Sequence, residues 1–256
     1  MSEIAPQFIV YVLCYLAMGL AAVALFAAGI MIAVNKIRQT RVLGAGYIIT
    51  AVSSAAVFTY NVLISFYNSE KVIVYGDAVM IGTLFCVFAS SLCICIYIHK
   101  TYGQKHIYIP VLLLPFVVML ADAGAVLMFN RIMTETIGQA MLISLVNDVN
   151  NIVTVTLIAI VIIIVLYRNR EKEKIIPKAW LIKGITVIWG IAEIVIISIV
   201  YISVIALVEA GDYDASSDNT VMFLSIVQAV DSIVAVIVPF YVLSRVRKAS
   251  KQQKAA

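Results

Sequence analysis

The chain consists of long apolar runs that are separated by short polar segments. A helix rises about 1.5 Å per residue, so about 20 apolar residues cross the roughly 30 Å hydrocarbon core of a bilayer. Seven runs are long enough, at 8–34, 42–66, 76–98, 107–130, 138–167, 179–208 and 220–244. The pattern predicts an all-α protein with a seven-helix transmembrane bundle over 1–244 and a basic cytoplasmic tail over 245–256.

The composition supports this class. Hydrophobic residues make up 63% of the 256 positions and charged residues only 12%, which is typical of a protein that spans the membrane several times. We expect a multi-pass protein of the plasma membrane.

The basic residues predict the orientation, because short loops rich in Lys and Arg stay in the cytoplasm. On the seven-helix topology, only Lys71 and Arg131 fall on the side of the amino terminus. The amino terminus is therefore predicted to lie outside and the tail inside. The net charge of +4 is explained by this distribution and by contact with anionic lipid, so no nucleic-acid partner is expected.

Five acids fall within the predicted spans, namely Asp77, Asp122, Asp148, Glu193 and Asp231. An ionised carboxylate that faces lipid costs several kcal/mol, so these side chains should face the bundle interior or a wet cavity. No Lys, Arg or His falls at the same depth. The acids are then protonated, hydrogen-bonded to polar neighbours, or neutralised by an imported cation.

Two interpretations of these acids stay open. They are hydrogen-bonding partners that fix helix packing, as polar residues commonly are in membranes, or they form a pocket that binds protons or ions. The identity of any metal is not predicted. His99 and His106 lie at a loop edge without a nearby acid or Cys and make a poor metal site, so no enzyme is expected.

Six segments of the chain, taken in order, resemble segments of one known protein family. They are LAMGLAAVALFAAG (16–29), AAVFTY (55–60), VYGDAVMIGTLF (74–85), MLADAGAVLM (119–128), GITVIWGIAE (184–193) and VDSIVAVIVPFYVLSR (230–245). Together they resemble the microbial rhodopsin family, and in particular its light-driven proton pumps, over most of the chain. The resemblance implies that Asp77 and Asp231 are the two counterions, and that Tyr60, Tyr75 and Trp189 line the pocket.

The resemblance has one large gap. Four residues after the second counterion, the family has the lysine that binds retinal as a Schiff base, and this chain has Ala235. A covalent retinal Schiff base is therefore not expected. Val74, Ala78 and Phe88 also differ from the pump pattern, so the proton relay of the pumps is mostly absent.

These observations predict a rhodopsin-like membrane protein without covalent retinal, acting as a non-photochemical sensor or partner-binding protein with an acid-lined pocket. The alternative is a proton or small-cation transporter that uses the intramembrane carboxylates. A third interpretation is non-covalent binding of retinal or a carotenoid against Trp189. The expected partners are the lipid bilayer, further copies of the chain in a homo-oligomer, and a membrane or cytoplasmic signalling partner.

Overall fold

The computed structural model describes residues 6–67, 70–132, 137–173, 175–209 and 213–255. Within these ranges it describes all side chains except those at 6–7, 64–67, 70–78, 80–81, 84, 119, 121–123, 125–132, 137–144, 147, 207–209, 213–221 and 253–255. Seven long helices account for most of the described chain: α1 (Pro6–Ala33), α2 (Arg41–Tyr67), α3 (Glu70–Tyr102), α4 (Tyr108–Ile132), α5 (Ile137–Arg168), α6 (Ala179–Glu209) and α7 (Tyr213–Ala255). The predicted all-α architecture and its seven helices are confirmed.

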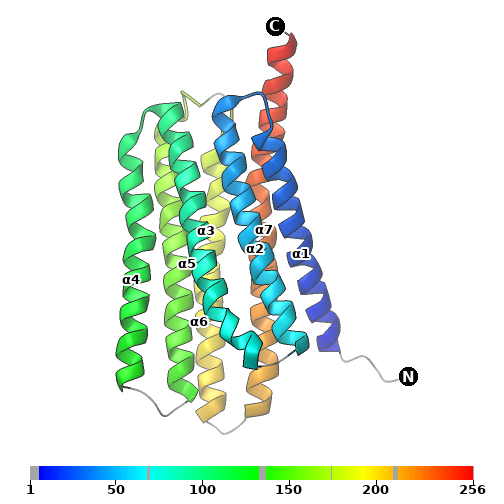
Figure 1. Cartoon of the computed structure of the whole chain (residues 1–256), viewed down its shortest axis with the longest axis vertical. Coiled ribbons are helices and arrows are strands. Elements are labelled where there is room, and N and C mark those ends of the chain that lie inside the picture. The colour runs from blue at the N-terminus through cyan, green and yellow to red at the C-terminus, as the bar shows by residue number, and fades with distance from the viewer. Residues whose placement is uncertain (1–5, 68–69, 133–136, 174, 210–212, 256) are drawn as a thin grey trace, which may run out of the picture.

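The helices run side by side and form one bundle (Figure 1). Each packs against the next in sequence, and α7 also packs against α1, so the bundle closes on itself. The α1–α2, α3–α4 and α5–α6 connections lie at the end of the bundle where α7 ends, and α1 begins at the opposite end.

Six of the helices are long and apolar enough to cross a membrane, and a shorter apolar segment over Lys105–Val118 includes the beginning of the seventh, α4. The outer faces are apolar as well. Along α6, five aliphatic side chains at helical spacing expose between 53% and 71% of their surface: Ile188, Ile191, Val195, Ile199 and Ile202. Such a stripe fits contact with lipid. The chain is a helical, multi-pass membrane protein.

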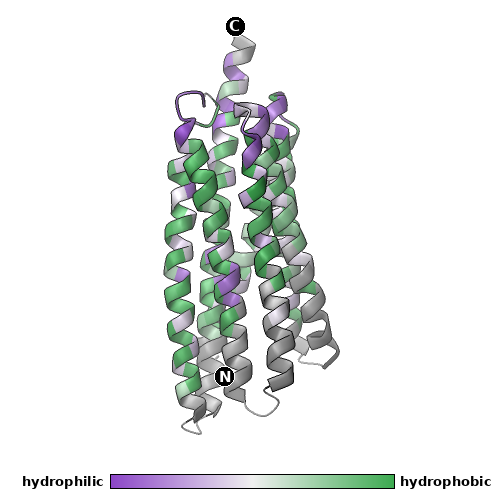
Figure 2. Ribbon diagram, turned by 90° about the vertical axis from the view of Figure 1, so that its left-hand side faces the viewer, coloured by the Kyte–Doolittle hydropathy of each residue, from purple (hydrophilic) through white to green (hydrophobic). Residues whose placement is uncertain are grey.

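Polar residues gather where α7 ends, and apolar residues cover the described helices below (Figure 2). We call this part of the molecule the basic end, because it carries Lys36, Arg38, Arg41, Lys100, Lys105, Arg168, Arg170, Lys172, Lys178, Arg245, Arg247, Lys248 and Lys251. Local hydrogen bonds order the α1–α2 connection there. The Asn35 side chain accepts from the Ile37 amide at 3.1 Å, and Arg41 Nε donates to the Asn35 carbonyl at 2.9 Å.

The largest buried cluster lies in the half of the bundle next to the basic end. We call it the basic-end core; its fully or nearly fully buried members are Ala28, Ile32, Ile37, Leu43, Cys95, Tyr97, Ile98, Ile107, Val111, Ile158, Ile162, Leu166, Ile176, Ala179, Val242, Leu243 and Val246. They come from all seven helices and their connections. This half of the bundle is therefore filled with close-packed apolar side chains.

The α1–α2 contact depends on small residues. A Cβ added at Gly44 would lie 2.7 Å from both Ala33 Cα and the Gly29 carbonyl oxygen. These are backbone atoms, which cannot move aside without shifting a helix. Glycine therefore allows the two helices to approach closely, as small residues do in membrane proteins.

Two helices extend well beyond their predicted spans. α3 begins at Glu70 and continues through His99 and Lys100 to Tyr102, where Gly103 adopts φ +72° and its amide bonds the His99 carbonyl at 2.8 Å, a common helix end. α7 continues through the predicted tail to Ala255. Hydropathy locates only the apolar part of a helix, and Lys, Arg, Gln and Ala in the tail are good helix formers.

Candidate functional site

Three of the five acids lie close together. Glu193, near the middle of α6, experiences the charges of both Asp231 on α7 and Asp148 on α5. The two charged neighbours are both acids, so their fields repel a negative charge on Glu193. Lys183, the nearest basic residue before Glu193 on α6, is ten residues away, or roughly 15 Å along the helix.

A cavity of about 190 Å³ lies between these helices. Its polar lining is two carboxylates and two amides, from Asp148, Glu193, Asn151 and Gln228, and its apolar lining is Ile152, Ile197, Leu224 and Val227. Carboxylates with amide neighbours offer only acceptors and neutral donors. The cavity therefore favours a ligand that carries positive charge.

Asp231 lies three residues after Gln228 and hence on the same face of α7. Desolvation by the surrounding helices is the main influence on this carboxylate, but the side chain is exposed, and it lies next to the residues that line the cavity rather than among them. The indole of Trp189 is its polar neighbour, but the buried Nε1 makes no hydrogen bond of normal geometry.

A tyrosine holds the third acid in place. The Tyr201 hydroxyl on α6 donates a hydrogen bond of 2.9 Å to Asp148 Oδ2 on α5. Tyr201 belongs to a small buried cluster with Ile197 and Val227, and Trp189 packs against it. Apolar packing thus fixes the donor, and the donor fixes the carboxylate.

The polar lining reaches α2 through an amide pair. Asn61 Nδ2 on α2 donates to Gln228 Oε1 on α7 at 2.9 Å. By contrast, several hydroxyls within the spans donate hydrogen bonds to carbonyls of their own helix. These are Thr50, Ser54, Thr59, Ser90, Thr154 and Ser232.

Only some of the remaining predicted site residues have side chains that the structure describes. Tyr60, Trp189 and Ala235 are half-buried on α2, α6 and α7. The side chains of Tyr75, Asp77 and Asp122 lie outside the described part of the structure, so the expected role of Asp77 as a counterion beside Asp231 stays a prediction. Within the described residues, no group of three or more His, Cys, Asp or Glu side chains has the arrangement of a metal site.

The cavity does not continue into the half of the bundle next to the basic end. On α5 its last lining residue, Ile152, is followed after six residues by Ile158 of the basic-end core, a rise of roughly 9 Å. On α7 the lining ends at Gln228, and the core begins at Val242. The apolar core therefore separates the acids from the basic end.

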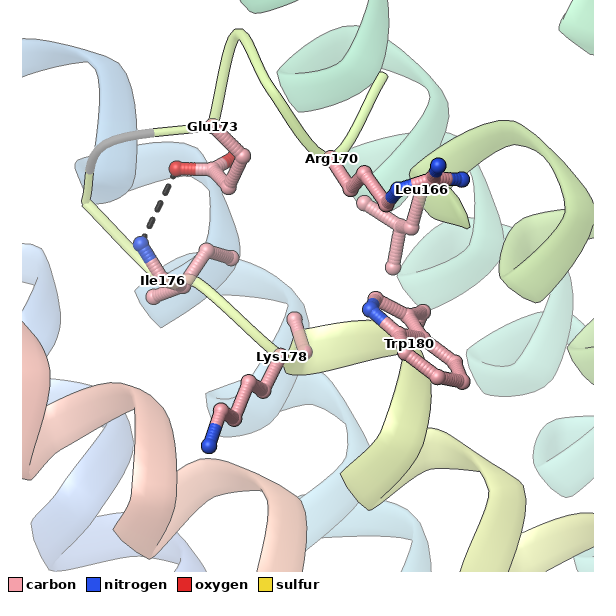
Figure 3. A pocket seen from close by; sticks show the side chains of 7 residues that line it. Leu166, Arg170, Glu173, Ile176, Lys178 and Trp180 are labelled. Carbon is pink, nitrogen blue, oxygen red and sulfur yellow. Dashed lines mark hydrogen bonds between the residues drawn. The ribbon is translucent and has the colours of Figure 1, made fainter. Parts of the chain in front are cut away.

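A second polar cluster, around Glu173 in the α5–α6 connection, was not predicted. Glu173 is only 8% exposed. Its Oε2 accepts from the Tyr97 hydroxyl at 3.0 Å and from the Tyr102 hydroxyl. Its Oε1 accepts from the amides of Ile175 and Ile176 at 2.8 and 2.9 Å, and Figure 3 shows the latter bond.

This cluster joins three parts of the basic end. Tyr97 and Tyr102 belong to α3, Glu173 to the α5–α6 connection, and the Tyr241 hydroxyl of α7 donates to the Pro177 carbonyl of the same connection at 2.6 Å. A carboxylate that accepts four hydrogen bonds is well stabilised without a basic partner. The arrangement holds the connection against the basic-end core.

Comparison of the chain with protein-family models, with curated proteins and with solved structures gives no match.

Proposed function

We propose that this chain is a rhodopsin-like seven-helix protein without covalent retinal, and that it binds a small cation in its acid-lined cavity and acts as a non-photochemical sensor rather than an enzyme. The observation that carries the proposal is that Asp148 and Glu193 line one cavity and that Asp231 lies close enough to Glu193 to act on its charge. A cation that enters this space relieves the repulsion among the acids and replaces the lost solvation.

The size of the cavity indicates the size of the ligand. An apolar cavity of about 150 Å³ accepts a molecule such as benzene, and the space here is about 190 Å³. A small organic ammonium or guanidinium ion fits this volume. Trp189, next to Asp231, adds an aromatic ring that attracts organic cations through its π face.

The sensor assignment rests on the division of the bundle into two halves. A ligand in the cavity contacts α5, α6 and α7, and all three helices also contribute residues to the basic-end core. In addition, Tyr241 of α7 bonds the Pro177 carbonyl of the α5–α6 connection. The positive-inside rule assigns the basic end to the cytoplasm of a plasma-membrane protein. A signalling partner that binds the basic end would respond to a change in helix packing.

Transport of protons or small cations is the second candidate. It is favoured by three carboxylates on adjacent helices, because such groups can pass a proton or hold an ion at membrane depth. The basic-end core argues against an open pore, since an apolar plug separates the acids from the basic end. Transport therefore requires a state in which this core opens.

Non-covalent binding of a retinoid or carotenoid is less well supported. Drug-sized ligands occupy pockets of roughly 300 Å³ or more, whereas the cavity measures about 190 Å³. Purified protein given all-trans retinal should show no visible band that hydroxylamine bleaches, and a stable covalent pigment would contradict the proposal.

Binding can be measured by fluorescence, because the chain has two tryptophans and one of them, Trp189, lies beside Asp231. In lipid nanodiscs, the Trp180→Phe protein should give a saturable fluorescence change with ethylammonium or guanidinium. Glu193→Gln should raise the Kd about tenfold or more, as expected for loss of a charge-assisted contact. Glu171→Gln, at an exposed acid in the α5–α6 connection, should leave the Kd unchanged.

Liposome flux separates the two candidates. A sensor binds the cation without carrying it, so proton and cation flux should equal that of empty liposomes. If flux is above this background and falls when Glu193 and Asp231 are replaced by Gln and Asn, the chain is a transporter.

A further inference from the structure

We propose that the outer surface where α5 ends and α6 begins binds the phosphate of an anionic phospholipid, through Arg170 and Trp180. This site is separate from the acid-lined cavity. It lies at the basic end, between the α5–α6 connection and the exposed apolar stripe of α6.

The guanidinium of Arg170 is held by an aromatic stack. Its Cζ lies 4.4 Å from the centre of the Tyr167 ring. That ring in turn meets Trp180 edge to face, with centroids 5.1 Å apart and planes at 78°. Two helices thus fix the position of one cation, because Tyr167 lies on α5 and Trp180 on α6.

The donors of this group are available to a ligand. Among the described residues, no carboxylate pairs with the exposed Arg170, and the nearby Glu173 already accepts four hydrogen bonds. In Figure 3 the Glu173 carboxylate turns toward Ile176, whereas the Arg170 guanidinium turns away from it, beside Leu166. A guanidinium of this kind matches the geometry of phosphate oxygens.

A small depression adjoins these side chains. Arg170, Leu166 and Trp180 line it together with Glu173, Ile176, Lys178 and Ala179, and its volume is about 10 Å³. This space is close to that of one water-sized sphere. It can therefore take one phosphate oxygen, but not a whole soluble ligand.

The surface next to the site suits an acyl chain. Tyr167 is 46% exposed, and on α6 an exposed apolar stripe runs from Leu181 through Ile185 to Ile188, with exposed fractions of 52%, 39% and 71%. Tyr and Trp commonly lie at the level of lipid headgroups. A lipid whose phosphate meets Arg170 has its chain beside this stripe, which favours a phospholipid over free phosphate.

The fluorescence of Trp180 can report a lipid bound at this position. In the Trp189→Phe protein, nanodiscs that contain brominated phosphatidylglycerol should quench Trp180 about fivefold more effectively per lipid than those with brominated phosphatidylcholine, as expected for one basic contact. Arg170→Gln should abolish the preference. Arg170→Lys keeps the charge but not the planar fork, and should retain only part of it.

Two controls make the test specific. Arg247→Gln removes another exposed charge at the basic end and should leave the preference intact. Inorganic phosphate should not relieve the quenching. Equal quenching by both lipids, an equal loss in Arg247→Gln, or relief by inorganic phosphate would each overturn the proposal.

Discussion

Tyr201 on α6 donates a hydrogen bond of 2.9 Å to Asp148 on α5, and this bond links the apolar wall of the cavity to its acids. The same wall contains Ile197 and Val227. The geometry of the acids is therefore set by packing between residues that lie far apart in the sequence.

Tyr201→Phe tests the contribution of this bond. The substitution keeps the ring and removes the donor, so the free energy of unfolding should fall by about 0.5–1.5 kcal/mol, the usual range for one intramolecular hydrogen bond. Thermal unfolding in detergent micelles measures the change. Tyr60→Phe is the matched control, since the Tyr60 hydroxyl has no hydrogen bond to another described residue, and it should change stability little.

Glu173→Ala should be the more damaging substitution at the basic end. It leaves two tyrosine hydroxyls and the amides of Ile175 and Ile176 without their acceptor, and each unsatisfied buried donor costs roughly 1–3 kcal/mol. The free energy of unfolding should therefore fall by more than about 3 kcal/mol. Hydrogen exchange in the α5–α6 connection should also accelerate.

Glu171→Ala provides the comparison, because it removes an exposed acid two residues earlier. Surface substitutions of this kind usually change stability by less than about 0.5 kcal/mol. Similar results for the two variants would contradict the role of Glu173.

Gly44→Ala tests the close approach of α1 and α2. The new methyl group would meet the backbone of Ala33 and Gly29, and overpacking of this kind costs about 1–3 kcal/mol. Gly184→Ala places a methyl group where no atom lies within 4 Å, so stability should be unchanged or slightly raised. Thermal unfolding of the two variants, compared with the parent, distinguishes the outcomes.

The sequence predicted the fold well and the site only in part. Long apolar runs identify seven helices because a bilayer leaves few alternatives to helical backbone. Counting residues along the helices also places Asp148, Glu193 and Asp231 at similar depths. It cannot tell which faces of α5, α6 and α7 meet, since these helices are apolar on most sides.

The Glu173 cluster shows what local reasoning misses. In the sequence Glu173 is one of several charges in a polar connection, and its partners Tyr97 and Tyr102 lie more than 70 residues earlier. The tyrosines near the end of α3, in YIHKTY, are the available sign. Similarly, hydropathy alone does not show that α7 continues as one helix to Ala255, although the tail is rich in good helix formers.

The central claim is that Glu193 and Asp231 act on one cation in one space. Cation titration of the Trp180→Phe protein, with Glu193→Gln, Asp231→Asn and both together, tests it most directly. Each single substitution should raise the Kd. The factor by which Asp231→Asn raises the Kd should differ at least about threefold between the protein with Glu193 and the Glu193→Gln protein, as expected for neighbouring groups. Unchanged Kd values, or effects that simply multiply, would show that the two carboxylates do not share a ligand.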